Sequence, residues 1–568
     1  MQTYDLERHR HSMAHILAQA ILRIYPNAKL GIGPVVEDGF YYEVDIVKEI
    51  TEKDFPRIEE EMWSIVKSNY PITQILINKD EAYNLLLHQG QIYKTEILGE
   101  IQAEEVSLYK TGDEFIDLCS GPHLPSTANV GFFKLTKIEE GNWRNMPSRP
   151  VMKKIYGVGF LSKKDLLNYL EKQEKLKESD HRKLGQEIGF YTIHNNTGLG
   201  MPLWLPKGAK LRNIIFDYLK FEKEKAGYSE VFTPTLIPGS SDLLNTTSES
   251  INKLTFPELI EQENKFILRT EKTPMHYQVF KFKNRSYREL PFRIYEHGYL
   301  FRNESEHELH GLTKTRIFTG ETNHIFCTEE QLFQEILTSF QLASKILSKF
   351  GLSDYKIQLS IDSDNNNKRF TWSVNVMLKV IETLKLTTRQ IEDKSTENGP
   401  KLELFVKDLF GKEWQISSIQ LDIFSTLKQK LHYINKKGKR NEVIVIRSTF
   451  IGSVERLIGL ILEKTLGNLP LWLSPEQVRV LPISQKYRAY AENIQFKLQK
   501  YGFRVGIDPN DETLQYRIKE SQQDRIPYMV IVGSKEESSG SISIRPREGQ
   551  DLGLMKLDDF TNLLNREL

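Results

Sequence analysis

Two polar side chains near the end of an expected strand have the chemistry to bind a nucleotide. We predict that residues 295–318 (YEHGYLFRNESEHELHGLTKTRIF) form a strand ending at Glu304, a polar loop, and a second strand from near Lys314 to Phe318. Arg302 and Glu304 are two residues apart, so on a strand they share a face. The guanidinium could grip a phosphate, the carboxylate could accept from an adenine amino group, and Phe318 could stack on a purine. If this stretch is considered alone, the simpler interpretation is that Arg302 and Glu304 form a surface ion pair that contributes little to stability.

Arg456 is a second candidate for a phosphate contact. The run GSVER (452–456) opens an apolar segment, LIGLILEKTLG, that we predict to be a helix. Helix N-termini attract anions through their free amides and dipole, which would bring a phosphate close to Arg456. The alternative is a helix-terminal arginine in a surface ion pair.

Three histidines and a cysteine could form a separate site in the N-terminal third. His11 and His15 are four residues apart in a helix expected over residues 6–24, so they share one face. Cys119 and His123 lie in DLCSGPH (117–123), which its Gly-Pro pair makes a turn. These nitrogen and sulfur donors would suit zinc. A hydrolytic site without metal, and scattered surface histidines, are the alternatives.

The remaining sequence predicts the elements that must hold these groups. Residues 162–189 are highly charged with a narrow leucine stripe, which is typical of a linker helix. An amphipathic helix over 211–226 ends at Gly227. Beyond Leu473 the pattern predicts a small α/β domain with a mixed sheet. Its expected strands are 478–482, 503–507, 528–532 and 541–545, and its helices are 487–501, 514–523 and one at the C-terminus.

Composition excludes several classes of protein. The 568 residues predict three or four domains, and 39% apolar with 27% charged residues fits a soluble globular chain. The 77 basic and 76 acidic residues nearly cancel, so any surface for nucleic acid must be local. Two cysteines form no disulfide framework and suit the cytoplasm. We expect no membrane span and no signal peptide.

Three stretches together resemble the motifs of class II aminoacyl-tRNA synthetases. Residues 295–318 resemble motif 2, residues 227–234 (GYSEVFTP) resemble motif 1, and GSVER resembles motif 3. The resemblance implies an antiparallel sheet flanked by helices, a homodimer joined near motif 1, and activation of an amino acid by ATP with Mg²⁺. It implies Arg302 on the α-phosphate and Arg456 on the γ-phosphate. The other implied positions are Glu304 and Phe318 on adenine, together with Lys401, Gln420, Arg316 and Lys314, which stands for an arginine of motif 2.

The N-terminal third resembles the editing domain of threonyl-tRNA synthetases. The resemblance rests on HSMAH, GIGPVVEDGFYYEVD (31–45) and DLCSGPH. In that family the domain hydrolyses serine wrongly attached to threonine tRNA, because one methyl group gives a synthetic pocket only about 1–3 kcal/mol of discrimination. Related alanyl-type modules hold zinc with this set of donors, whereas the threonyl type is thought to work without it. The implied editing residues are His11, His15, Cys119 and His123, supported by Tyr42, Lys94 and Asp117.

The expected amino-acid pocket departs from the family pattern. Threonyl enzymes hold a zinc ion there with one cysteine and two histidines, and the zinc binds the amino and hydroxyl groups of threonine. Thr273 stands in the cysteine position and Arg447 in that of one histidine, so only His324 is kept. We therefore expect no zinc in this pocket. Asn398 replaces a usual tyrosine, and the family's N-terminal ubiquitin-like domain is not expected.

The C-terminal stretch resembles the anticodon-binding domain of the threonyl, prolyl and histidyl group. Glu512, Lys519 and Arg504 are candidate RNA contacts, and a solvated mixed-charge surface is the alternative. The whole therefore predicts an α+β multidomain protein. Its parts are an editing domain (1–161), a linker helix (162–189), a class II catalytic domain (190–473) and an anticodon-binding domain (474–568).

The expected function is ATP-dependent ligation of threonine to tRNA(Thr) with hydrolytic editing of seryl-tRNA. Two alternatives stay open because the amino-acid pocket is altered. One is a paralogue that activates another amino acid, and the other is a tRNA-editing hydrolase that has lost synthesis.

Overall fold

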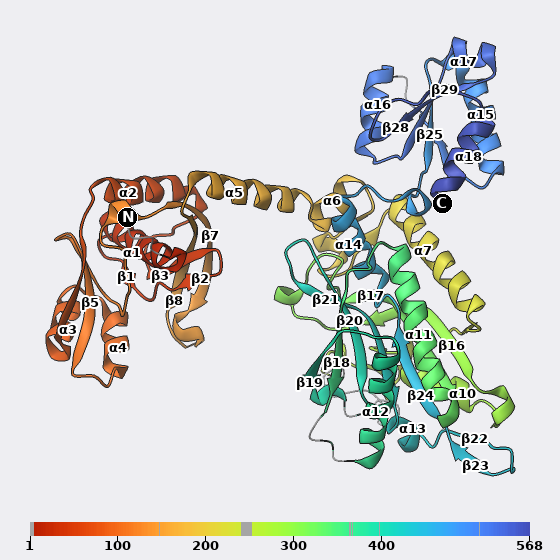
Figure 1. The fold of residues 1–568 in the computed structure, drawn as a ribbon, viewed down its shortest axis with the longest axis horizontal. Coiled ribbons are helices and arrows are strands. Elements are labelled where there is room, and N and C mark those ends of the chain that lie inside the picture. Colours follow the sequence, from red (N-terminus) through yellow and green to blue (C-terminus); the bar gives the residue numbers. More distant parts are fainter. Residues whose placement is uncertain are drawn as a thin grey trace. The chain divides into compact units, whose positions relative to one another are not determined.

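The computed structural model describes residues 5–568 apart from 147, 240–252, 363–364, 366, 397 and 510–511. The chain divides into two compact units, Met1–Lys175 and Leu176–Leu568. Both combine helices with largely antiparallel sheets (Figure 1), so the predicted α+β class is confirmed. No helix in the described part of the chain is both long enough and apolar enough for a membrane crossing.

Helix α1 (Leu6–Ile24) forms the centre of the first unit and has the predicted bounds. Asp5 caps it, because the carboxylate accepts from the Arg8 amide at 2.8 Å. The helix packs on strand β3 (Gly39–Asp45) and helix α2 (Phe55–Lys67), and its Met13 and Leu17 side chains are fully buried there.

Two antiparallel sheets complete the first unit. Their orders are β1-β3-β8-β7, with β2 beside β3, and β4-β5-β6. Strand β6 ends at Leu118, so Cys119 opens the loop that carries His123 to α1. The remaining bounds are β1 (Lys29–Leu30), β2 (Val35–Val36), β4 (Ile72–Asn78), α3 (Lys79–His88), α4 (Ile92–Glu100), β5 (Glu105–Thr111), β6 (Phe115–Leu118), β7 (Phe132–Asn142) and β8 (Val151–Phe160).

The expected linker helix is two helices. Helix α5 (Lys163–Glu178) ends before Asp180, and α6 (His181–Glu187) begins after it. Asp180 caps α6, because its carboxylate accepts from the Arg182 amide at 2.7 Å. An aspartate used as an N-cap takes an extended backbone, and this breaks the predicted single helix.

An eight-stranded sheet organises the second unit, in the order β11-β16-β17-β24-β21-β20-β18-β19. Helix α11 (Glu329–Lys349) packs on β17, β21 and β24, and helix α14 (Val454–Thr465) packs on β17. The strand bounds are β11 (Ser229–Glu230), β16 (Phe292–Phe301), β17 (Ile317–Cys327), β18 (Lys356–Ile361), β19 (Thr388–Glu392), β20 (Lys401–Lys407), β21 (Glu413–Asp422) and β24 (Ile444–Thr449).

The same part of the second unit contains further helices and strands. They are β9 (Tyr191–Thr192), β10 (Leu203–Trp204), α7 (Pro206–Lys225), β12 (Leu236–Pro238), β13 (Leu259–Glu261), β14 (Asn264–Leu268), α10 (Thr273–Lys281), β15 (Arg285–Ser286), α12 (Lys368–Thr383), α13 (Ser425–Lys428), β22 (His432–Ile434) and β23 (Arg440–Glu442). Helix α7 begins five residues before the predicted 211, because Pro206 fits a first helical turn, and it ends before Gly227, whose φ is +80°.

The hairpin predicted over 295–318 is correct in kind but wrong in its bounds. Strand β16 ends at Phe301, and β17 begins at Ile317 rather than near Lys314. Arg302 and Glu304 therefore lie in the connecting loop, not on a strand. The reason is a contact distant in sequence: the Arg316 amide donates to the Gly200 carbonyl at 2.8 Å, which takes it out of the sheet ladder.

The stretch 227–234, which resembles motif 1, contributes only a two-residue strand to the sheet. Only Ser229–Glu230 pairs with β16. The Thr233 and Pro234 carbonyls instead accept from the buried guanidinium of Arg269, at 3.1 and 3.2 Å, so these residues cannot continue the ladder.

The C-terminal part has the predicted mixed sheet, in the order β26-β25-β27-β28-β29. Strands β26, β25 and β27 are parallel, and β28 and β29 are antiparallel to their neighbours. Helix α17 and strand β29 were not predicted. The bounds are β25 (Val478–Pro482), α15 (Arg488–Lys500), β26 (Val505–Ile507), α16 (Leu514–Gln523), β27 (Tyr528–Val532), α17 (Ser534–Ser539), β28 (Ile542–Pro546), β29 (Gly553–Met555) and α18 (Leu557–Glu567).

Candidate active sites

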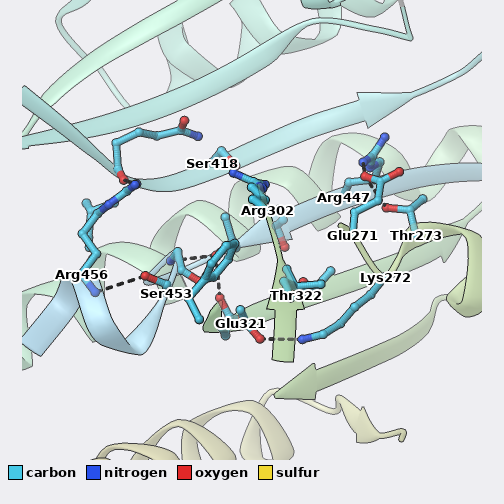
Figure 2. Close-up of a pocket in the computed structure, with 18 of the residues that line it drawn as sticks. Glu271, Lys272, Thr273, Arg302, Glu321, Thr322, Ser418, Arg447, Ser453 and Arg456 are labelled. Carbon is cyan, nitrogen blue, oxygen red and sulfur yellow. Dashed lines mark hydrogen bonds and ion pairs between the residues drawn. The ribbon is translucent and has the colours of Figure 1, made fainter. Parts of the chain in front are cut away.

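A cavity of about 400 Å³ opens on the eight-stranded sheet. Figure 2 shows Arg456 and Ser453 at one end, Arg302 between, and Glu271, Thr273 and Arg447 at the other end. The second unit thus brings together nearly every residue that the sequence analysis assigned to synthesis. Those lining the cavity are Arg302, Glu304, Lys314, Phe318, Lys401, Gln420, Asn398, Thr273, His324, Arg447 and Arg456.

Two guanidinium groups, Arg456 at one end and Arg302 in the middle, give this side of the cavity its positive charge. Arg456 donates to the carbonyls of Thr313 and Gln415 at 2.9 and 2.8 Å, and burial lowers its pKa to about 10, so it is charged at neutral pH. Arg302 lies over the Phe318 ring at 5.1 Å, and burial lowers its pKa too. Its Nε is buried and has no hydrogen-bond partner among the described residues. Two like charges here favour a polyanion as ligand.

The loop after β16 is fixed from both sides. The Lys314 ammonium lies 3.2 Å from the Glu304 carboxylate. Arg316 does not line the cavity; its Nε donates to the Glu304 carbonyl at 2.8 Å and so holds the loop in shape. Lys401 is paired with Glu403 at 2.5 Å.

The other end of the cavity has a different chemistry. Strand pairing sets His324 directly opposite Arg447. The Arg447 guanidinium lies 2.6 Å from the Glu271 carboxylate and 3.6 Å from that of Asp422. Burial disfavours its charge, but the two carboxylates outweigh this and raise the pKa of Arg447. Thr273, the first residue of α10, donates to the same oxygen of Glu271 at 3.5 Å.

These positions do not fit a zinc ion. A threonine hydroxyl and a guanidinium are not zinc ligands, which leaves His324 as the one donor of the family's set of three. Among the described residues, the clusters of three or more candidate metal ligands lie elsewhere.

A chain of hydrogen bonds sets the tautomer of His324. Burial would raise the pKa of Glu296, but His276 and nearby cations hold it at about 2, so it is an ionised acceptor. His276 Nε2, 3.2 Å away, therefore donates to it. The Nδ1 atom of His276 is then free to accept from His324 Nδ1 at 2.9 Å. His324 Nε2 is left with a lone pair and no partner among the described residues.

Sequence analysis missed Glu271 and Lys272 in the pocket. Both residues come directly before Thr273-Pro274, where α10 begins. A charged residue at such a position is usually interpreted as interacting with the helix dipole. Lys272 is fully buried, donates to the Glu296 and Gly320 carbonyls at 3.0 and 2.5 Å, and has its pKa lowered to about 7 by burial.

The first unit brings the predicted histidines and cysteine together. The ligand atoms of His11, His15, Cys119 and His123 all lie within 4.8 Å of one another. Cys119 Sγ is 3.2 Å from His11 Nε2 and 3.3 Å from His123 Nε2. Burial lowers the pKa of each histidine, so all three are neutral at pH 7, and raises the pKa of the Cys119 thiol to about 11. The four donors can surround a metal, but the thiol would have to lose its proton.

The predicted supports of this site form a buried network. Asp117 accepts from the Tyr42 hydroxyl and lies 2.6 Å from the Lys94 ammonium. Asp117 also lies 3.7 Å from His15 Nε2. All four side chains are buried. Asp117 therefore lies between the Lys94 ammonium and the face of α1 that carries His15.

The candidate RNA contacts differ in their surroundings. Glu512 and Lys519 are exposed. Arg504 is not available in the same way, because its guanidinium donates to the carbonyls of Ser474 and Trp472 at 2.9 and 2.7 Å. These bonds make Arg504 fix the chain segment leading into β25, and its role as an RNA contact stays a prediction.

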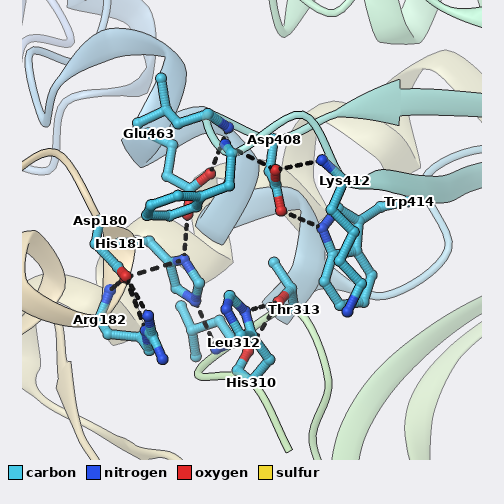
Figure 3. Close-up of polar contacts among 12 residues, drawn as sticks. Asp180, His181, Arg182, His310, Leu312, Thr313, Asp408, Lys412, Trp414 and Glu463 are labelled. Carbon is cyan, nitrogen blue, oxygen red and sulfur yellow. Dashed lines mark hydrogen bonds and ion pairs between the residues drawn. The ribbon is translucent and has the colours of Figure 1, made fainter. Parts of the chain in front are cut away.

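A buried histidine joins three parts of the second unit. His181, at the start of α6, lies 2.6 Å from the Glu463 carboxylate on α14 and accepts from the Leu312 amide at 3.0 Å (Figure 3). Asp180, His181 and Glu463 have the spacing of metal ligands, but both ring nitrogens are already engaged. Since Arg456 bonds to the neighbouring Thr313 carbonyl, we read this cluster as a support for the cavity loop.

Replacing His181 by alanine should therefore destabilise the second unit. Removal of the imidazole takes away a buried hydrogen-bond partner from both the Glu463 carboxylate and the Leu312 amide. Such a loss typically lowers the free energy of unfolding by about 3–5 kcal/mol. The expected result is a lower midpoint of thermal unfolding, whereas replacing the exposed His307 should leave it unchanged. Equal midpoints for the His181 variant and the wild type would contradict this role.

Three parts of the chain match models of known protein families. A family model described as tRNA synthetase class II core domain (G, H, P, S and T) matches residues 256–465. Models of an anticodon binding domain and of the threonyl and alanyl tRNA synthetase second additional domain match residues 477–567 and 106–144.

Individual relatives extend over nearly the full length. A threonine–tRNA ligase of Thermotoga neapolitana is 38% identical over 569 residues, covering 99% of this chain and 88% of the relative. The Aquifex aeolicus ligase of the same name is 36% identical over 573 residues, covering 99% and 89%. A crystal structure titled as the RNA binding domain of threonyl-tRNA synthetase from Cryptosporidium parvum is 30% identical, with a TM-score of 0.64 over 68% of this chain and 98% of that one.

Proposed function

Since this chain belongs to the threonyl-tRNA synthetase family, we propose that it ligates threonine to tRNA(Thr) through an aminoacyl-adenylate and hydrolyses mischarged seryl-tRNA. The observation that carries the proposal is the single cavity with a cationic end, a central arginine and an amino-acid end. The proposed boundaries are 1–161, 162–189, 190–473 and 474–568, and each stretch matched by a family model lies inside one of these parts.

The substrate carboxylate attacks the α-phosphate of MgATP in line, so the protein has mainly to position groups and neutralise charge. Arg302 binds the α-phosphate and Arg456 the γ-phosphate, while Glu304 and Phe318 hold the adenine. Supporting this, Arg302 has an unused buried donor and lies between the two ends of the cavity. Lys314 keeps Glu304 in place, and Lys401 and Gln420 border the same space.

Editing is a hydrolysis of the seryl ester in the first unit. A neutral histidine can take a proton from water. The tetrad of His11, His15, Cys119 and His123 supplies three neutral histidines around a protonated thiol. Asp117, Lys94 and Tyr42 orient His15 from behind. In this proposal, water and the tetrad are sufficient for editing without a metal ion. The proposal also places no zinc ion in the amino-acid pocket of the second unit.

Amino-acid-dependent ATP–pyrophosphate exchange, run with each of the twenty amino acids and with or without added zinc, tests the function. Exchange with threonine alone, unaffected by zinc, supports it. Exchange with a different amino acid would favour the repurposed paralogue. No exchange with any amino acid, beside active deacylation of seryl-tRNA, would favour the editing hydrolase.

The proposed partners are tRNA and a second copy of the chain, in the cytoplasm. Glu512, Lys519 and Arg504 are retained as candidate anticodon contacts. Dimerisation near motif 1 is supported by Phe232, which is 85% exposed beside β11. Sedimentation should give a mass close to twice the 66.2 kDa of one chain, and a Phe232→Asp variant should sediment as one chain; a monomeric wild type would end the dimer proposal.

A further inference from the structure

We propose that Glu271 and His324 read the amino acid directly: Glu271 accepts from its ammonium group and His324 from its side-chain hydroxyl. The two side chains thereby replace the contacts that a zinc ion makes in the family. The inference rests on the proposed function for the hydroxyl, but the ammonium contact applies to any amino acid.

One oxygen of Glu271 is committed and the other is free. Oε2 is 2.6 Å from Arg447 and 3.5 Å from the Thr273 hydroxyl, so the carboxylate is held in one orientation. Oε1 is buried and has no hydrogen-bond partner among the described residues, although Glu271 lines the cavity. A buried acceptor without a partner is costly and rare in native proteins. A bound ammonium group, which is a donor only, would satisfy it.

The charge at this end of the cavity fits the same ligand. Glu271 and Asp422 are two carboxylates around one guanidinium, that of Arg447. Asp422 is fully buried and also accepts from the Tyr277 hydroxyl at 2.6 Å. In this cluster the carboxylates outnumber the guanidinium by one, and Arg302 also acts on Glu271 electrostatically; a substrate ammonium would add a positive partner in direct contact with Glu271. A cluster that served only as a structural ion pair would not need the second carboxylate or leave an oxygen unused.

His324 offers the matching acceptor for a hydroxyl. Its Nε2 has a lone pair, because Nδ1 is protonated in the chain through His276 to Glu296. The atom is buried and unpartnered among the described residues, and His324 lines the cavity. The antiparallel register pairs His324 with Arg447, and Arg447 forms the ion pair with Glu271, so both acceptors belong to residues that line the same cavity around one guanidinium.

The first test is Glu271→Gln, which keeps the shape and removes the charge. We expect the KM for threonine in ATP–pyrophosphate exchange to rise roughly 10- to 100-fold, the range expected for a lost hydrogen bond to a charged group, while the KM for ATP changes little. Inhibition by 3-hydroxybutyrate, which is threonine without its amino group, should not change. The exposed Glu306→Gln is the matched control and should behave as wild type.

The second test is His324→Leu, compared on threonine and valine. The wild type should prefer threonine strongly, because a site built around a hydroxyl rejects an isostere that lacks it. The variant should lose roughly 10- to 100-fold of that preference. Calorimetry with threonine alone reports the same contacts without catalysis and also shows whether the variant still folds and binds.

The outcomes separate the two proposals. If the wild type activates another amino acid, threonine ligation is wrong, but Glu271→Gln must still weaken that amino acid's binding. If Glu271→Gln leaves amino-acid KM and calorimetric affinity unchanged, the inference is overturned while the function stands. Activation that disappears with a chelator and returns with zinc, in the wild type but not in the His324 variant, would also overturn it. A wild type that binds no amino acid would refute both.

Discussion

An Arg302→Ala variant is expected to activate threonine about 10³-fold more slowly than the wild type, as found when one preorganised donor to a developing negative charge is removed. The guanidinium stands between the cationic end of the cavity and the amino-acid end, and its Nε has no partner among the described residues. Burial lowers the pKa of Arg302, and in such a partly desolvated place its charge interacts more strongly with a phosphate than it would in water.

Arg302→Lys separates charge from shape in this prediction. A lysine keeps the positive charge but cannot form two parallel hydrogen bonds or lie flat on the Phe318 ring. We expect it to recover part of the rate, between the alanine variant and the wild type. Pyrophosphate exchange at saturating ATP measures the rate, and deacylation of seryl-tRNA is the internal control because its residues lie in the other unit. An alanine variant with more than about a tenth of the wild-type rate would remove Arg302 from the α-phosphate.

The sequence predicted best where apolar runs are bounded by local signals. The bounds of α1, β25, α16 and β27 agree with the predictions at both ends. These elements take their ends from nearby caps and turns, such as Asp5 before α1 and Thr513 before α16. Local patterns were therefore sufficient for them.

Long-range contacts decided the elements that sequence reasoning misplaced. The start of β17 depends on the Gly200 carbonyl, and the end of β11 depends on the Arg269 guanidinium. Arg504 has a structural role of the same kind, since nothing in the local sequence indicates that the Ser474 and Trp472 carbonyls would accept from its guanidinium. Glu271 was missed for a related reason: its importance comes from Arg447, 176 residues away.

His15→Ala is expected to slow deacylation of seryl-tRNA by about 10²- to 10⁴-fold, the usual contribution of a general base. Burial keeps the pKa of His15 well below its ordinary value, so the ring is neutral and keeps a nitrogen lone pair for a water proton throughout the physiological range. Threonine activation should not change, because the cavity is in the other unit. Rates of both reactions on the same preparation give the comparison.

Cysteine variants then decide what the thiol does. With a pKa of about 11 the thiol is protonated at neutral pH, so it is a poor nucleophile and serves as a bridge between His11 and His123. Cys119→Ala should therefore slow editing by loosening both rings, and Cys119→Ser, which retains a hydroxyl donor, should restore much of the rate. A serine variant as slow as the alanine variant, together with stoichiometric zinc in the wild type, would favour a metal held by the tetrad. Unchanged deacylation in both Cys119→Ala and His15→Ala would instead remove the editing assignment, because it would mean that these side chains do not activate the attacking water.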